Sequence, residues 1–135
     1  MSDDLYQQQI LDHYQHPHNL GELKDADLVL EESNASCGDN FTFYIKFNNP
    51  PPFPKGELRG VVIDKITFTG TGCAISTTAC SLLTDKLIGK PVSHINKLNL
   101  KFMHKLIGVE VTLLRQKCLM LPVKAVQKIY KQTKD

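Results

Sequence analysis

The clearest hydrophobic pattern in the chain is the alternation of apolar and polar residues in FTFYIKF, residues 41–47. Its phenylalanines and its isoleucine fall on one side of an extended backbone, which predicts a half-buried β-strand. Residues 28–33 and 58–69 are also expected to form strands, the second of them through VVIDKITF. Three strands in succession predict an antiparallel meander. The proline-rich loop 48–56 lies between the last two, and it is unable to pair in a sheet.

A helical pattern precedes the strands. Residues 4–14 place Leu5, Ile10, Leu11 and Tyr14 near one face, which predicts a short amphipathic helix. Proline and glycine in the following HPHNLG stretch end it.

The second half of the chain is expected to be mainly helical. Residues 74–89 have a helical pattern, with a terminal glycine and a proline beyond it. Residues 93–107 predict two short helical pieces, and residues 122–132 a last helix with Pro122 in its first turn. The stretch 109–114 is ambiguous between strand and helix. The predicted fold is α+β, a three-stranded antiparallel sheet with helices packed on one face.

Length and charge narrow the classes of protein. The chain has 135 residues, which predicts a single domain over residues 1–135. A formal net charge of +2 does not argue for nucleic acid, and a solvated helix face accounts for the C-terminal lysines. No apolar run reaches the roughly 20 residues that span a bilayer, and MSDDLYQQQ does not resemble a signal peptide. We therefore expect a cytoplasmic protein without membrane or nucleic-acid partners, whose thiols stay reduced.

Three of the four cysteines stand where reactive or metal-binding thiols are found. Cys37 lies in a Ser-Cys-Gly-Asp turn before a strand, and Cys73 follows a glycine turn and begins a helix. A helix N-terminus favours the thiolate, the form that binds metals and attacks electrophiles. Cys118 is placed just before the last helix, where Arg115 and Lys117 are expected to lower its pKa.

Cys80 differs from the other three. It follows Cys73 by seven residues in a predicted helix, a rise of about 10.5 Å. Two thiolates on one tetrahedral metal lie only about 4 Å apart, so Cys80 is excluded from a mononuclear site with Cys73. Leu83 and Leu87 at helical spacing indicate a core position for Cys80.

The remaining candidates form one set of potential metal ligands. Three soft sulfur donors and one carboxylate suit zinc or an iron–sulfur cluster. The alternative is that each cysteine is a small buried hydrophobic residue. The candidate ligands are Cys37, Asp39, Cys73 and Cys118.

Four stretches of the chain resemble the U-type iron–sulfur scaffold family, which comprises IscU, SufU and the N-terminal part of NifU. They are LYQQQILDHYQHPHNLG (5–21), NASCGD (34–39), TGCAISTTACSLLTDKLIGKPV (71–92) and RQKC (115–118). The resemblance implies a three-stranded antiparallel sheet with helices on one side. It also implies that a pyridoxal-phosphate cysteine desulfurase donates sulfur as a persulfide, and that apo iron–sulfur proteins receive the product.

The resemblance assigns roles to the candidate residues. Cys37, Cys73 and Cys118 correspond to the three thiols that hold a [2Fe–2S] cluster, and Asp39 to the aspartate two residues after the first of them. In SufU the same four residues hold zinc. We expect Cys37 to accept the persulfide sulfur, because its glycine turn gives access. The protein is then a scaffold or sulfur acceptor rather than a stand-alone enzyme.

The motifs agree with SufU more closely than with IscU. IscU proteins have a histidine before the third cysteine, where this chain has Lys117. They also have Leu-Pro-Pro-Val-Lys nearby, where this chain has VTLLRQK. The insertion usual in SufU is missing, because only residues 74–117 separate the second and third cysteines.

One alternative of a different class remains from the sequence. A zinc-stabilised interaction module without sulfur chemistry would have a closed site and unreactive thiols. His13, His16 and His18 have spacings that a metal could use, but a proline interrupts them and we expect no metal there.

Overall fold

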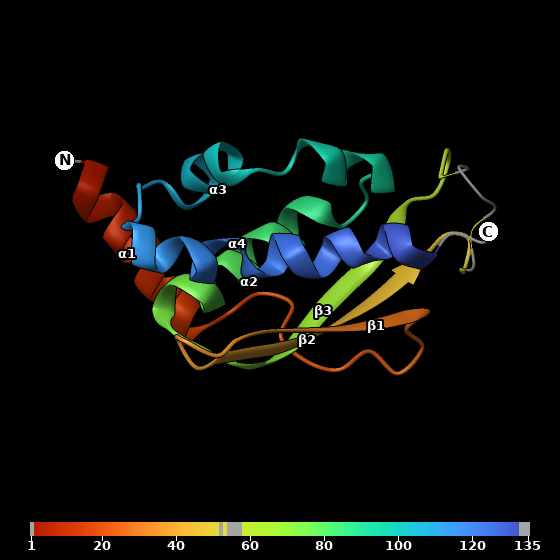
Figure 1. Cartoon of the computed structure of the whole chain (residues 1–135), viewed down its shortest axis with the longest axis horizontal. Helices are drawn as coiled ribbons and strands as arrows, with labels where there is room; N and C mark the ends of the chain where they lie inside the picture. Colours follow the sequence, from red (N-terminus) through yellow and green to blue (C-terminus); the bar gives the residue numbers. More distant parts are fainter. Residues whose placement is uncertain (1, 52, 54–57, 133–135) are drawn as a thin grey trace.

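The computed structural model describes residues 2–51, 53 and 58–132, and its centre is a three-stranded antiparallel sheet of order β1-β2-β3. The strands are β1 (Leu28–Asn34), β2 (Asp39–Phe47) and β3 (Ile63–Thr71). The helices are α1 (Ser2–Gln15), α2 (Ala74–Leu87), α3 (Leu100–Ile107) and α4 (Leu113–Gln127), with 3-10 helices η1 (Val92–Lys97) and η2 (Lys128–Gln132). Helices α2 and α4 cover one face of the sheet, which confirms the expected α+β architecture (Figure 1).

Strand β2 is the centre of the core because every second side chain of it is buried. The alternation that predicted this strand therefore gives its observed inner face. Helix α2 supplies the facing layer, where Cys80, Leu83 and Leu87 are all buried. This confirms the core position of Cys80. Of the proline-rich loop 48–56, residues 52 and 54–56 lie outside the described residues.

Helix α4 begins nine residues earlier than the sequence pattern predicts, at Leu113 instead of Pro122. Pro122 is inside the helix, so the carbonyl of Cys118, four residues earlier, receives no helical hydrogen bond from it. The prediction was wrong because Leu113 and Leu114 are 81% and 83% exposed, which hides the helical period in the first turn. Cys118 consequently lies within a helix and not before one.

Helix α1 is not amphipathic in the expected sense. Leu5, Leu11 and Tyr14 are exposed, and only Ile10 of the predicted apolar face packs against the core. Polar contacts hold the helix instead: the Thr78 hydroxyl donates to the Ile10 carbonyl at 3.1 Å. Among the described residues, no helix is both long and apolar enough to cross a bilayer.

Candidate metal centre

The turn between β1 and β2 carries the first candidate ligand. Asn34 and Asp39 are the last pair of the β1–β2 ladder, and the chain reverses over the four residues between them. Gly38 has φ of 72°, a left-handed conformation that glycine adopts without strain. The turn leaves Cys37 partly exposed, whereas Asp39 at the start of β2 is 1% exposed.

Asp39 has two carboxylate oxygens in different states. Oδ1 accepts hydrogen bonds from the backbone N–H of Cys73 at 3.0 Å and from the Ser76 hydroxyl at 2.9 Å. Oδ2 is buried and has no hydrogen-bond partner in the described part of the chain. A buried carboxylate oxygen without a partner is costly, which leaves this oxygen available to a metal ion.

Two thiols lie beside this carboxylate. Ligand atoms of Cys37, Asp39 and Cys118 all lie within 4.8 Å of one another. Two sulfur ligands of one tetrahedral zinc are about 4 Å apart, so the observed spacing is close to that of a metal site. Within residues 2–51, 53 and 58–132, no other three histidine, cysteine or acidic side chains converge in this way.

Cys73 lies at the margin of this trio. It is the N-cap of α2, and its sulfur accepts the backbone N–H of Ser76 at 3.4 Å. Its sulfur is not one of the three donors within 4.8 Å, but its thiol interacts with that of Cys118. Burial alone would raise the pKa of Cys73, but hydrogen bonds from the Ser76 hydroxyl and amide and with Cys118 bring it below its ordinary value.

Cys118 is the buried member of the set, with 0% exposure. The pKa of its thiol is raised, first by burial and then by the neighbouring side chains of Cys37, Cys73 and Asp39. The expected lowering by cationic neighbours was therefore wrong for this arrangement of the residues. Arg115 does interact with Cys118 and Cys73, and these thiols raise the pKa of its guanidinium.

Two residues that support the site, Gly72 and Ser76, were not expected from the sequence. A Cβ atom on Gly72 would lie 2.4 Å from the Ser76 Oγ and 2.7 Å from the Asp39 Oδ1. Only glycine leaves room for the contact between β2 and the start of α2. The sequence signal for Ser76 was its position three residues after the N-cap, where capping contacts occur.

An open pocket borders the candidate centre on the side of Cys37. Its lining combines the exposed leucines at the start of α4 with two cationic side chains. The pocket is lined by Ser36, Cys37, Leu113, Leu114, Arg115 and Lys117.

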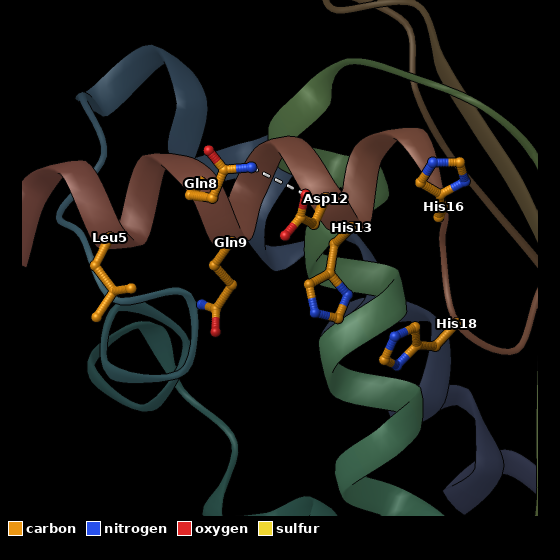
Figure 2. A pocket seen from close by; sticks show the side chains of 7 residues that line it. All are labelled: Leu5, Gln8, Gln9, Asp12, His13, His16 and His18. Carbon is orange, nitrogen blue, oxygen red and sulfur yellow. Dashed lines mark hydrogen bonds between the residues drawn. The ribbon is translucent and has the colours of Figure 1, made fainter.

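A second pocket contains the N-terminal histidines, which come from α1 and the segment after it (Figure 2). The rings of His13 and His18 have centroids 4.5 Å apart. His13 Nδ1 is 2.7 Å from the Ser81 Oγ, and His18 Nδ1 is 2.5 Å from Asp85 Oδ2. These contacts tie α1 and the following segment to α2.

Comparison with known proteins places this geometry in a family. Residues 5–134 match the family described as "NifU-like N terminal domain". The zinc-dependent sulfurtransferase SufU of Bacillus subtilis (strain 168) is 34% identical over 90 residues, which are 67% of this chain and 53% of that protein. The iron–sulfur cluster assembly scaffold protein IscU of Aquifex aeolicus (strain VF5) is 33% identical over 103 residues, 76% of this chain and 60% of that protein. The chain thus matches little more than half the length of these relatives.

Solved structures show the same fold. A putative iron–sulfur cluster assembly scaffold protein for the SUF system from Fervidobacterium islandicum AW-1 has a TM-score of 0.70 and 26% identity, covering 94% of this chain and 97% of that one. The N-terminal part of a NifU-like protein from Brucella abortus has a TM-score of 0.71 at 20% identity, over 96% of this chain and 94% of that one. The architecture and the match over residues 5–134 show that the chain belongs to the NifU-like N-terminal domain family.

Proposed function

We propose that this protein accepts persulfide sulfur from a cysteine desulfurase and carries it into iron–sulfur cluster assembly. Residues 1–135 act as one cytoplasmic domain in this proposal. Its candidate ligands, Cys37, Asp39, Cys73 and Cys118, hold either zinc or a labile [2Fe–2S] cluster. The observation that carries the proposal is the buried, unpartnered Oδ2 of Asp39 beside the thiols of Cys37 and Cys118.

The donor set fits both groups. Three thiolates and a carboxylate are ligands that zinc accepts. Three thiolates also supply most of the protein ligands that a [2Fe–2S] cluster needs. With zinc the site would have a net charge of about −2, which the nearby Arg115 and Lys117 offset. A bound zinc ion would keep its thiol ligands deprotonated, whereas a cluster would be cargo that is built and passed on.

Cys37 is the residue best placed to accept sulfur. It lines the open pocket, while Cys118 is fully buried. Its thiolate attacks the outer sulfur of the donor persulfide, R–S–SH, and the S–S bond of the donor breaks. The donor leaves as a thiolate, and Cys37 retains the transferred sulfur as S–SH with its proton. No external oxidant or reductant is needed for this exchange.

The partners follow from the same pocket. The desulfurase must bring its persulfide within bonding distance of Cys37, so its surface would cover the exposed Leu113 and Leu114. Apo iron–sulfur proteins would receive the sulfur or the cluster. The names of the SufU and IscU relatives support sulfur transfer and cluster assembly respectively.

One experiment separates the zinc and cluster forms. The protein is purified without added metal, its metal content is measured by mass spectrometry, and it is incubated anaerobically with a desulfurase, cysteine and ferrous iron. Stoichiometric zinc, no cluster absorption and faster desulfurase turnover indicate a zinc-dependent sulfur acceptor. Metal-poor protein that develops [2Fe–2S] absorption, lost in Cys37→Ser and kept in Cys80→Ser, indicates a scaffold. Tight zinc with thiols that neither alkylate nor accept sulfur would instead support an inert interaction module.

A further inference from the structure

Only one oxygen of the Asp39 carboxylate is free to bind a metal. Oδ1 already accepts two hydrogen bonds, from the Cys73 N–H and the Ser76 hydroxyl. Oδ2 accepts none from the described residues and is buried. A metal would therefore meet a carboxylate that is fixed at one end and available at the other.

Ser76 connects two of the four candidate ligands. Its hydroxyl is 2.9 Å from Asp39 Oδ1, and its backbone N–H is 3.4 Å from the sulfur of Cys73. The same hydroxyl lies 3.2 Å from the Cys73 carbonyl oxygen and 3.5 Å from the Cys73 sulfur. Because Ser76 has 0% exposure, no water competes freely for these contacts.

We propose that Ser76 is a positioning residue that holds Asp39 as a one-oxygen metal ligand. This inference rests on the proposed function, since it assumes that Asp39 binds the metal. The Ser76 hydroxyl and the Cys73 N–H together fix the plane of the Asp39 carboxylate. Oδ2 therefore already points toward the metal position before a metal binds. Without the hydroxyl, one hydrogen bond remains, and the carboxylate is free to rotate away from the thiols.

The expected effect is on metal affinity. Removing a residue that hydrogen-bonds to a metal ligand typically lowers metal affinity by about 10–100-fold. We expect a loss in this range for Ser76→Ala. Cobalt(II) alone is the probe, because thiolate-to-cobalt absorption reports the sulfur ligands and the visible bands report the coordination geometry. Ser76→Ala should retain the thiolate absorption while its visible bands change.

The matched variants separate the hydroxyl from the packing around it. Thr keeps the hydroxyl, whereas Val has the same shape but lacks it. Ser76→Thr should therefore bind cobalt nearly as the wild type does, and Ser76→Val should bind as Ser76→Ala does. Ser81→Ala is the control, because Ser81 is equally buried on α2 but contacts His13 and His18 instead of the site. Thermal unfolding of the metal-free variants shows that each is folded.

A double-mutant cycle gives the decisive result. If Ser76 acts through Asp39, Ser76→Ala should have no further effect on cobalt affinity in an Asp39→Ala background. An equal loss in both backgrounds, or no loss in Ser76→Ala, would overturn the inference while leaving metal binding intact. Absence of cobalt binding in the wild type would overturn the proposed metal site as well.

Discussion

The backbone N–H of Cys73 donates a hydrogen bond to Oδ1 of Asp39 at 3.0 Å. This bond joins the first residue of β2 to the N-cap of α2, 34 positions apart in the sequence. Two candidate metal ligands are thereby fixed to each other before any metal is present. The protein thus has a largely formed site whose unsatisfied atom is Asp39 Oδ2.

Asp39→Asn should weaken zinc binding while it stabilises the metal-free protein. The amide keeps an oxygen for the Cys73 N–H but removes a buried negative charge. We expect zinc affinity to fall by at least about 10-fold, which is the smallest loss typical when a residue that hydrogen-bonds to a metal ligand is removed. Competition with a chromogenic chelator measures the affinity, and thermal unfolding measures the stability. Unchanged affinity would mean that Asp39 does not bind the metal.

Gly72→Ala should disrupt the site through steric overlap. The added methyl would lie 2.4 Å from the Ser76 Oγ and 2.7 Å from Asp39 Oδ1, so both side chains must move. We expect a destabilisation of about 1–3 kcal/mol, typical of overpacking, together with weaker metal binding. Gly60→Ala is the comparison, because its methyl enters open space and meets only an unfavourable φ of 78°. Equal metal affinities in the two variants would contradict this account.

Stability should fall as the pH is lowered, through His13 on α1. Burial, assisted by the nearby His18 (Figure 2), lowers the pKa of His13, although Asp85 and Asp12 act in the opposite direction. The unfolded imidazole then binds a proton more readily than the folded one. The stabilisation is complete above the unfolded pKa of about 6.5 and is lost as the pH falls through the lower folded value.

The measurement for His13 is the free energy of unfolding of metal-free protein between pH 7.5 and 5, at about half-unit steps. The decline should be smaller in His13→Gln than in the wild type. His16→Gln is a suitable control, since His16 is exposed and follows α1 without the hydrogen bond to α2 that His13 makes. Identical pH dependence in the wild type and His13→Gln would contradict the prediction.

The exposed leucines beside Cys37 should matter for the partner and not for the metal. Leu113→Glu combined with Leu114→Glu should raise the concentration of this protein needed for half-maximal stimulation of a desulfurase. Zinc content should not change, because both side chains are more than four-fifths exposed. Val29→Glu, 52% exposed on β1, tests the effect of a charge elsewhere. Similar effects at both places would argue against docking at the leucines.

The strands could be predicted because their burial pattern is local. Alternation in residues 41–47 follows directly from a sheet with one buried face. Helix α1 shows where this reasoning fails, since polar contacts such as Thr78 with Ile10 hold it and leave Leu5 exposed. The start of helix α4 was predicted too late for a similar reason, because its first turn has exposed leucines instead of a buried face.

The candidate ligands could be proposed from the sequence, but their supporting contacts could not. Turn and cap positions singled out Cys37, Asp39 and Cys73 as candidates without knowledge of the fold. Ser76 and Gly72 acquire their roles only because β2 and α2 meet, at distances that no local pattern encodes. The raised pKa of Cys118 likewise depends on burial by distant residues.

The most direct test of the central claim is to locate the transferred sulfur. The protein is incubated with a cysteine desulfurase and cysteine, its thiols are alkylated, and peptides are analysed by mass spectrometry. We predict one added sulfur atom on Cys37, absent in Cys37→Ser and present in Cys80→Ser. Persulfide on none of Cys37, Cys73 and Cys118, or equal labelling of Cys80, would contradict sulfur acceptance at this site.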